Sequence, residues 1–297
     1  MKRIMMLALT NFGVLAVLFI TWNIISAVFG IQVGGGSFTG IAIMALIFGF
    51  GGAFISLWLS KWMAKRSMGV EIIETPKTPQ ERWLVETVRR QAEASGIGMP
   101  EVGIFHSPDP NAFATGAKRN DALVAVSTGL LNQMTADEVE AVLGHEIGHV
   151  ANGDMVTQTL LQGVLNTFVI IFARIIGMAV DSFLRSDEDE NGGMGMGYFI
   201  GSIIAEIFLG FIATAIVMWF SRYREFHADK AGADLAGRAK MIAALKRLQS
   251  AHSGHDLPGE MAAFGIAGGL GDGLKKIFTT HPPLEDRIAA LEAKQYG

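Results

Sequence analysis

Two histidines and a glutamate stand together in the sequence as His145-Glu146-Ile147-Gly148-His149. Residues four apart on a helix point the same way, so the imidazoles of His145 and His149 can bind one metal ion. Glu146 then lies beside that ion without ligating it. Zinc lowers the pKa of a bound water to about 7, and a neighbouring carboxylate can take the water's proton and return it to a leaving amine. The pattern predicts zinc-assisted peptide hydrolysis, with Glu146 as the catalytic base.

The motif is informative but insufficient by itself. A His-Glu-x-x-His pattern arises by chance in on the order of one in a hundred chains of this composition. The alternative is a surface helix with two solvated histidines. Thr135 and Glu138 have the form of a capping box and apolar residues follow at helical spacing, so a helix is predicted under either interpretation. A catalytic zinc also requires a third protein ligand.

Glu225 is the strongest candidate for that third ligand. The chain has no cysteine, which leaves only histidine and carboxylate as ligands. Asp229 follows Glu225 by one helical turn and can orient a ligand histidine. The alternative is an ordinary charged helix turn, but His149 lies just before one apolar segment, residues 155–180, and Glu225 lies just after the next, residues 198–220. An out-and-back hairpin would return Glu225 to the membrane face at which His149 lies.

The N-terminal part of the chain has the composition of a membrane anchor. Residues 4–60 contain no Asp, Glu, Lys, Arg or His, whereas about 20 apolar residues suffice to cross a bilayer as a helix. Glycines at 34–36 suit a turn, so we expect two spanning helices at residues 4–29 and 38–60. Lysine and arginine flank both ends, which predicts that both face the cytoplasm. A cleaved signal peptide is the alternative, but its apolar region would be about twice the usual length.

The second pair of apolar segments is a weaker membrane signal. Each is interrupted by one charge, Arg174 in residues 155–180 and Glu206 in residues 198–220. A central charge costs about 3 kcal/mol on insertion scales, so burial in protein or a position at the membrane interface is the alternative to spanning for each helix. The charged residues of the linker, residues 181–197, are all acidic except Arg185, which favours a non-cytoplasmic loop and therefore predicts that both helices span the membrane. Arg174 and Glu206 can neutralise each other; a proton or substrate path is the functional alternative.

Composition narrows the class of protein. Of 297 residues, 50% are hydrophobic and 18% charged, and the net charge is −4. This composition is too apolar for an ordinary soluble enzyme, and the net negative charge provides no basic surface that would attract nucleic acid.

Short strands are predicted at residues 102–105, 111–117 and 122–127. The expected fold is a mainly α membrane protein with four apolar helices in two hairpins and a cytoplasmic zincin domain with a small β-sheet. Its expected parts are residues 1–66 (first hairpin), 67–154 (first part of the zincin domain), 155–220 (second hairpin) and 221–297 (second part of the zincin domain).

Several motifs together carry a resemblance to a known family. Besides the apolar hairpin and the His-Glu-x-x-His helix, they are Asn111-Ala112-Phe113-Ala114-Thr115-Gly116, Ser221-Arg222-Tyr223-Arg224-Glu225-Phe226-His227-Ala228-Asp229 and Thr280-His281-Pro282-Pro283-Leu284. On these residues the chain closely resembles, from end to end, the HtpX family of bacterial heat-shock membrane metalloproteases, which are related to the CAAX prenyl-proteases. No position in these motifs departs from the family.

The resemblance implies a gluzincin-like enzyme with one zinc ion per chain. The zinc would be bound by His145, His149 and Glu225, with catalysis by Glu146. The resemblance also implies a multi-pass protein of the bacterial inner membrane whose catalytic domain is cytoplasmic. Its partners would be the lipid bilayer and misfolded, damaged or misassembled membrane proteins, which it would cleave as part of stress-response quality control.

Two further site expectations follow from the resemblance. Residues Asn111, Ala112, Phe113 and Ala114 would form an edge strand that receives substrate in extended form, since backbone hydrogen bonds bind many sequences without selecting one. The alternative is a plain sheet strand. His281 precedes two prolines, and in the related proteases a residue near this position helps to stabilise the tetrahedral oxyanion. The alternative for His281 is a structural turn. His227 should face away from the zinc.

Two rival functions remain open on the sequence. A non-catalytic quality-control adaptor would bind unfolded segments and keep only the metal fold, but the intact Glu146 speaks against it. A protease of prenylated C-termini is the second rival. Those enzymes enclose a chamber with more membrane helices than this sequence predicts.

Overall fold

The structure is a computed structural model that describes residues 2–30, 38–184, 194–252 and 281–294. These residues form two compact units. Unit 1 comprises Met1–Leu57 and Gln158–Val217, and unit 2 comprises Trp58–Thr157 and Met218–Gly297. The predicted glycine turn at 34–36 and most of the acidic linker lie outside the described residues.

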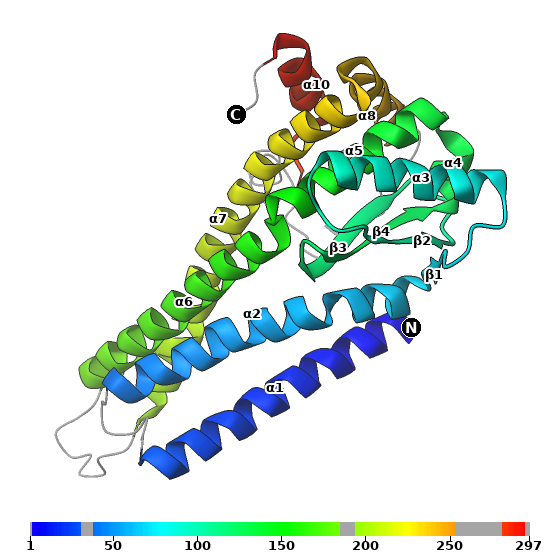
Figure 1. Cartoon of the computed structure of the whole chain (residues 1–297). Helices are drawn as coiled ribbons and strands as arrows, with labels where there is room; N and C mark the ends of the chain where they lie inside the picture. Colours follow the sequence, from blue (N-terminus) through cyan, green and yellow to red (C-terminus); the bar gives the residue numbers. More distant parts are fainter. Residues whose placement is uncertain (1, 31–37, 185–193, 253–280, 295–297) are drawn as a thin grey trace. The chain divides into compact units, whose positions relative to one another are not determined.

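Unit 1 contains helices from both predicted hairpins (Figure 1). They are α1 (Lys2–Phe29), most of α2 (Phe38–Met68), most of α6 (Asp154–Leu184) and the first half of α7 (Met196–Ala236). Helices α2, α6 and α7 are long and apolar enough to cross a membrane, whereas the described residues of α1 contribute the shorter apolar stretch Ala16–Val28. Three membrane helices are therefore supported by length and composition, and the fourth stays a prediction.

The helices of unit 1 contact one another closely and expose large apolar side chains on their outer surfaces. The Thr167 hydroxyl of α6 donates a 3.3 Å hydrogen bond to the Ala45 carbonyl of α2. Arg174 Nη2 of α6 lies 3.0 Å from Glu206 Oε1 of α7, which confirms the predicted neutralising pair. Large apolar side chains such as Phe208 are exposed. Exposed apolar surface on this scale is typical of helices that face lipid.

Unit 2 is built around a four-stranded mixed sheet. Its strands are β1 (Glu71–Ile72), β2 (Glu101–Phe105), β3 (Ala112–Lys118) and β4 (Asp121–Ser127), in the order β1-β2-β4-β3. Strands β2 and β4 are parallel and the other neighbours are antiparallel. The three predicted strands are confirmed to within a residue or two, whereas β1 is too short to leave a pattern. Strand β3 lies at the edge of the sheet, where one side of its backbone has no strand partner among the described residues.

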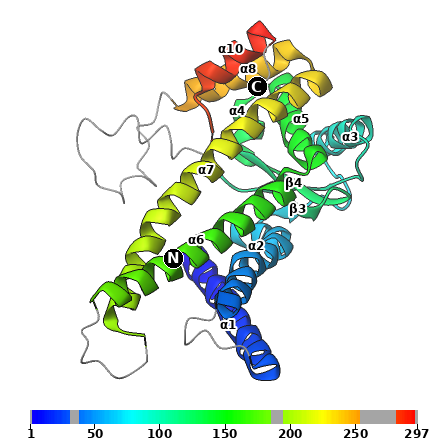
Figure 2. The ribbon, with the colours of Figure 1, turned by 90° about the vertical axis from the view of Figure 1, so that its left-hand side faces the viewer.

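Helices cover the sheet of unit 2 and form its core. They are α3 (Pro79–Ala94), α4 (Thr128–Gln133), α5 (Ala136–Asn152), α8 (Arg238–His252) and α10 (Leu284–Ala293). Helices α3 and α5 lie over one face of the sheet (Figure 1), and α8 and α10 lie side by side (Figure 2). The core includes Leu84, Val124, Leu143, Leu245 and Leu291. Each fully buried leucine contributes about 1.5–3 kcal/mol, so this packing holds α5 firmly in place.

Candidate active site

Helix α5 carries the His-Glu-x-x-His motif, and its position is set at both ends. The predicted capping box is present, with Thr135 accepting from the Glu138 amide and the Glu138 carboxylate accepting from the Thr135 amide. Gly153 ends the helix at φ 71° and ψ 34°, a left-handed conformation that favours glycine. Helix α6 begins at the next residue, Asp154. One left-handed residue therefore separates the two helices, and the side chain of Asp154 contacts His149 of α5.

The end of α7 lies directly against α5. A Cβ atom added at Gly148 would be 2.5 Å from the Cβ of Ala231, so only glycine permits this approach. Helix α7 continues without a break beyond its apolar segment, residues 198–220, and carries Glu225 and Asp229 in its last turns. Both carboxylates therefore reach the histidines of α5, and all these residues belong to unit 2.

The predicted ligand atoms form a triangle of the size that zinc requires. His145 Nε2 and His149 Nε2 are 3.1 Å apart. Glu225 places Oε2 3.6 Å from His145 Nε2 and Oε1 3.3 Å from His149 Nε2. A tetrahedral zinc with bonds of about 2.0–2.1 Å separates its ligand atoms by about 3.3–3.4 Å. Among the described residues, these three form the one group of histidines and carboxylates arranged to hold a metal.

Two carboxylates orient the histidines. His145 Nδ1 lies 3.0 Å from Asp229 Oδ1, and His149 Nδ1 lies 2.6 Å from Asp154 Oδ2. An ionised carboxylate can only accept a hydrogen bond, so each Nδ1 carries the proton and each Nε2 presents a lone pair. Two lone pairs and the Glu225 carboxylate thus converge on one point. A bound cation accounts for this arrangement, and the donor set suits zinc.

Each orienting carboxylate is itself held by an arginine. Arg287 of α10 donates from Nε and Nη2 to Asp229, at 2.7 and 2.5 Å, and its Nη1 lies 3.1 Å from Glu225 Oε2. Arg224 of α7 forms an ion pair with Asp154. The side chains of Arg287 and Asp229 are 8% and 2% exposed, so this bidentate pair is almost fully desolvated. The arginines fix the carboxylates, and the carboxylates fix the imidazole rings.

The electrostatics keep the carboxylates of the site ionised. Burial would raise the pKa of Glu225, but its contacts with His149 and His281 and the charge of Arg287 hold that pKa well below its usual range. Burial would likewise raise the pKa of Asp229, and hydrogen bonds from Arg287 and His145 lower it. Burial lowers the pKa of His149, but the contact with Glu225 and the charge of Glu146 outweigh that effect and raise it, so a proton and a metal ion compete for its Nε2. The site therefore offers a strongly anionic environment to a cation.

Glu146 is positioned differently from the other acidic residues of the site. It follows His145 on α5 and is only partly buried. Among the described residues, its carboxylate has no hydrogen-bond or ion-pair partner, whereas Glu225 and Asp229 are both engaged. A carboxylate free to exchange a proton with a bound water is what general base catalysis requires.

The remaining predicted residues lie at different distances from the three predicted metal ligands. His281 Nδ1 lies 2.8 Å from Glu225 Oε2 while 63% of its side chain is exposed, so this histidine borders the site. Its part in stabilising an oxyanion stays a prediction. His227 Nδ1 lies 3.0 Å from the Tyr223 carbonyl of its own helix, and it is not part of the ligand group. Asn111 precedes β3, and Ala112–Lys118 forms the edge strand that contacts α5.

Two residues of the site were missed by sequence reasoning. Nothing in the local sequence links Asp154 to His149, because their contact depends on the left-handed conformation of Gly153 between them. For Arg287, the sequence itself contains a signal of burial. Arg287 lies three residues after Leu284 and four before Leu291, so it is a charged residue on the apolar face of an amphipathic helix. Such a residue needs a buried partner, and Asp229 supplies one.

This combination of a His-Glu-x-x-His helix, a carboxylate from a later helix within reach of both histidines and a sheet edge beside them is that of a metal-dependent peptidase. The sequence profile described as peptidase family M48 matches residues 78–295, and the chain belongs to this family. It is 56% identical over 297 residues to Protease HtpX of Thioalkalivibrio sulfidiphilus (strain HL-EbGR7), covering 99% of this chain and 100% of that protein. It is 58% identical over 292 residues to Protease HtpX of Xanthomonas oryzae pv. oryzae (strain MAFF 311018), covering 98% and 97%.

Among solved structures, the fold is similar to the crystal structure of S. mikatae Ste24p. The TM-score is 0.66 at 16% sequence identity, over 98% of this chain and 64% of that chain. At this identity the likeness concerns the fold alone. Together, the family and the full-length relatives make this chain a metalloprotease with membrane-type helices.

Proposed function

We propose that the chain is a membrane-embedded zinc endopeptidase that hydrolyses peptide bonds of misfolded or damaged membrane proteins. Its action would take place at the cytoplasmic face of the bacterial inner membrane, as part of stress-response quality control. The observation that carries this proposal is the convergence of His145, His149 and Glu225, with both imidazoles oriented by carboxylates, in a chain with three helices apolar enough to span a membrane.

The residues of the chain divide the chemistry among them. His145, His149 and Glu225 would hold the zinc, which, when bound, polarises a carbonyl and lowers the pKa of a water to about 7. Glu146 takes the proton from the attacking water and returns it to the leaving amine. The edge of β3 holds the peptide backbone in extended form. His281, whose Nδ1 lies 2.8 Å from Glu225 Oε2, donates a hydrogen bond to the developing oxyanion.

The catalytic role of Glu146 is tested by Glu146→Ala. The purified protein, loaded with zinc in detergent, should cleave casein about 10²- to 10⁴-fold more slowly than the unmodified protein, because general acid–base catalysis contributes on this order. Its zinc content should stay the same, since Glu146 is no ligand. Glu93→Ala is the matched control, because Glu93 is an exposed glutamate at the end of α3. Undiminished cleavage by the Glu146→Ala protein would contradict the proposed role of Glu146 as the catalytic base.

The proposed topology can be tested because the chain has no cysteine of its own. Single cysteines introduced as Glu93→Cys and Ser186→Cys report on the catalytic unit and the acidic linker. In intact cells, an impermeant thiol reagent applied from outside the inner membrane should label the linker cysteine and leave Glu93→Cys unlabelled. If both were protected from the reagent, the second hairpin would not span.

A further inference from the structure

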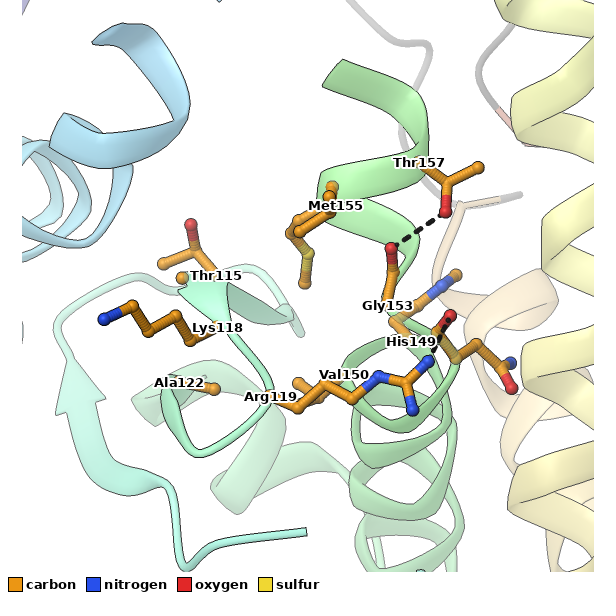
Figure 3. Close-up of a pocket in the computed structure, with 12 residues that line it drawn as sticks. Thr115, Lys118, Arg119, Ala122, His149, Val150, Gly153, Met155 and Thr157 are labelled. Carbon is orange, nitrogen blue, oxygen red and sulfur yellow. Dashed lines mark hydrogen bonds between the residues drawn. The ribbon is translucent and has the colours of Figure 1, made fainter. Parts of the chain in front are cut away.

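A hollow of about 230 Å³ lies beside the metal site within unit 2 (Figure 3). Three segments enclose it: the end of β3 with the turn into β4, the last turn of α5, and the first residues of α6. His149 lines this hollow together with Thr115 and Gly116 of β3. It therefore extends from the edge strand to a residue that we assign to the metal.

The hollow is placed to receive a substrate side chain. A peptide that adds to the free edge of β3 directs alternate side chains to the same face. Because Thr115 of that strand and the ligand residue His149 border one hollow, a side chain close to the scissile bond would enter it. This step rests on the proposed binding of substrate at β3.

The lining combines apolar walls with two cations, Lys118 and Arg119. The Lys118 side chain points away from His149, whereas Arg119 points toward the end of α5 (Figure 3). Ala122, Val150 and Met155 provide apolar surface. The side chain of Arg119 runs from the β3–β4 turn to the end of α5, where Nη2 donates a long 3.4 Å hydrogen bond to the Asn152 carbonyl (Figure 3). A guanidinium has five N–H donors, and this is its one protein hydrogen bond within the described part of the chain. Arg119 is exposed, so its other donors are accessible to a ligand.

We propose that this hollow is a specificity pocket for an acidic substrate side chain, glutamate above all, and that Arg119 determines the preference. The methylene groups of a glutamate would lie against the apolar walls, and its carboxylate would accept paired hydrogen bonds from the guanidinium. A lysine in the same place would face Arg119 and be repelled.

Quenched fluorescent peptides that differ only in Glu, Gln or Lys, placed in turn at each position around one cleavage site, test this pocket. At one position, kcat/KM for Glu should exceed that for Lys by about tenfold, the range of a charge-assisted hydrogen bond at a partly exposed site. Arg119→Glu should reverse that preference, and Arg119→Gln should abolish it. Arg89→Glu, the same change of charge at an exposed position of α3, should leave it unaltered. Zinc content and thermal unfolding midpoint should be the same in all variants.

Binding to the inactive Glu146→Ala protein gives a second measurement that does not depend on cleavage. Fluorescence anisotropy should show the Glu peptide binding about tenfold more tightly than the Lys peptide, with the order reversed when Arg119→Glu is added. Equal affinities, or an order that Arg119→Glu leaves unchanged, would overturn the pocket assignment. Absence of peptide cleavage by the unmodified enzyme would instead contradict the proposed function, while the anisotropy would still decide the pocket.

Discussion

Two charged clusters in this molecule are alike in composition and differ in what they do. Each joins an arginine to a carboxylate on another helix. In unit 1, Arg174 and Glu206 are 3.0 Å apart, with 25% and 37% of their side chains exposed. In unit 2, Arg287 contacts both Asp229 and Glu225, and these three side chains are 8%, 2% and 5% exposed. The first cluster has one charge of each sign, whereas the second has more carboxylates than guanidinium groups.

The difference in charge balance separates a structural pair from a site. Arg174 and Glu206 neutralise each other, so this pair has no net charge with which to attract an ionic ligand. In unit 2, Arg287 contacts two carboxylates, and the imidazoles carry no positive charge once a metal ion takes the place of a proton on Nε2. The surplus negative charge is buried, which is costly unless a cation is bound. A buried cluster with unbalanced charge therefore indicates a metal site more strongly than burial alone.

The largest effect is expected from removing Arg287, the arginine that contacts both Asp229 and Glu225. Arg287→Met leaves Asp229 buried without a counter-charge, and breaking a buried pair in this way costs about 3–5 kcal/mol. The thermal unfolding midpoint of the zinc-free protein in detergent should fall accordingly. Arg174→Met is the matched variant in unit 1 and should cause a smaller fall, because Glu206 is more exposed. Equal falls would show that the two clusters do not differ as described.

Metal affinity should depend on the orienting carboxylates. Asp154→Asn weakens the acceptor of the His149 Nδ1 proton, and loss of such a partner reduces metal affinity about 10- to 100-fold. Competition with a chelating zinc indicator measures this change. Asp137→Asn is the control, since Asp137 lies in the same region of sequence, is 70% exposed and pairs with Lys240. Unchanged affinity in Asp154→Asn would remove the carboxylate from the site.

A substitution in unit 1 should affect stability and leave metal binding intact. A Cβ atom added at Gly49 would lie 2.2 Å from Thr167 Oγ1 and 2.7 Å from its backbone nitrogen, so Gly49→Ala must push α2 and α6 apart. Overpacking of this kind costs about 1–3 kcal/mol. Gly210→Ala, where nothing lies within 4 Å, is the control and should be neutral or slightly stabilising. Unfolding midpoints and zinc titrations of both variants check the contrast.

The smallest effect is expected when the pair in unit 1 is removed completely. The double variant Arg174→Leu with Glu206→Leu leaves no unpaired charge, so its unfolding midpoint should correspond to a change within about 1 kcal/mol. Casein cleavage should persist. A large loss of cleavage without a loss of stability would favour the proton or substrate path over the structural role of this pair.

The elements that local rules govern could be predicted from the sequence. The capping box at Thr135, the helical spacing of His145 and His149, and the strand pattern of residues 122–127 depend on neighbours within a few residues, and all are confirmed. Glu225 was reached by reasoning about an out-and-back hairpin, and the structure places it in the ligand group. Its function as a ligand remains a prediction.

The contacts that depend on tertiary packing could not be predicted in the same way. The two residues of β1 carry no periodicity, and their pairing with β2 exists only in the folded sheet. The contact between Asp154 and His149 requires the left-handed conformation of Gly153, which the sequence suggests only as a helix end. Arg287 lies in a helix whose apolar face is marked by Ile288 and Leu291, but the partner of a buried charge is set by how that helix packs.

The position of Arg287 along the chain has a consequence for biosynthesis. Arg287 is made 142 residues after His145 and 58 residues after Asp229. A growing chain that has just completed α7 already contains every predicted zinc ligand, but Asp229 still lacks its guanidinium. The orienting network is completed only when α10 has been synthesised and has packed against α8. Translation order thus delays assembly of the finished site until after both apolar hairpins have been made.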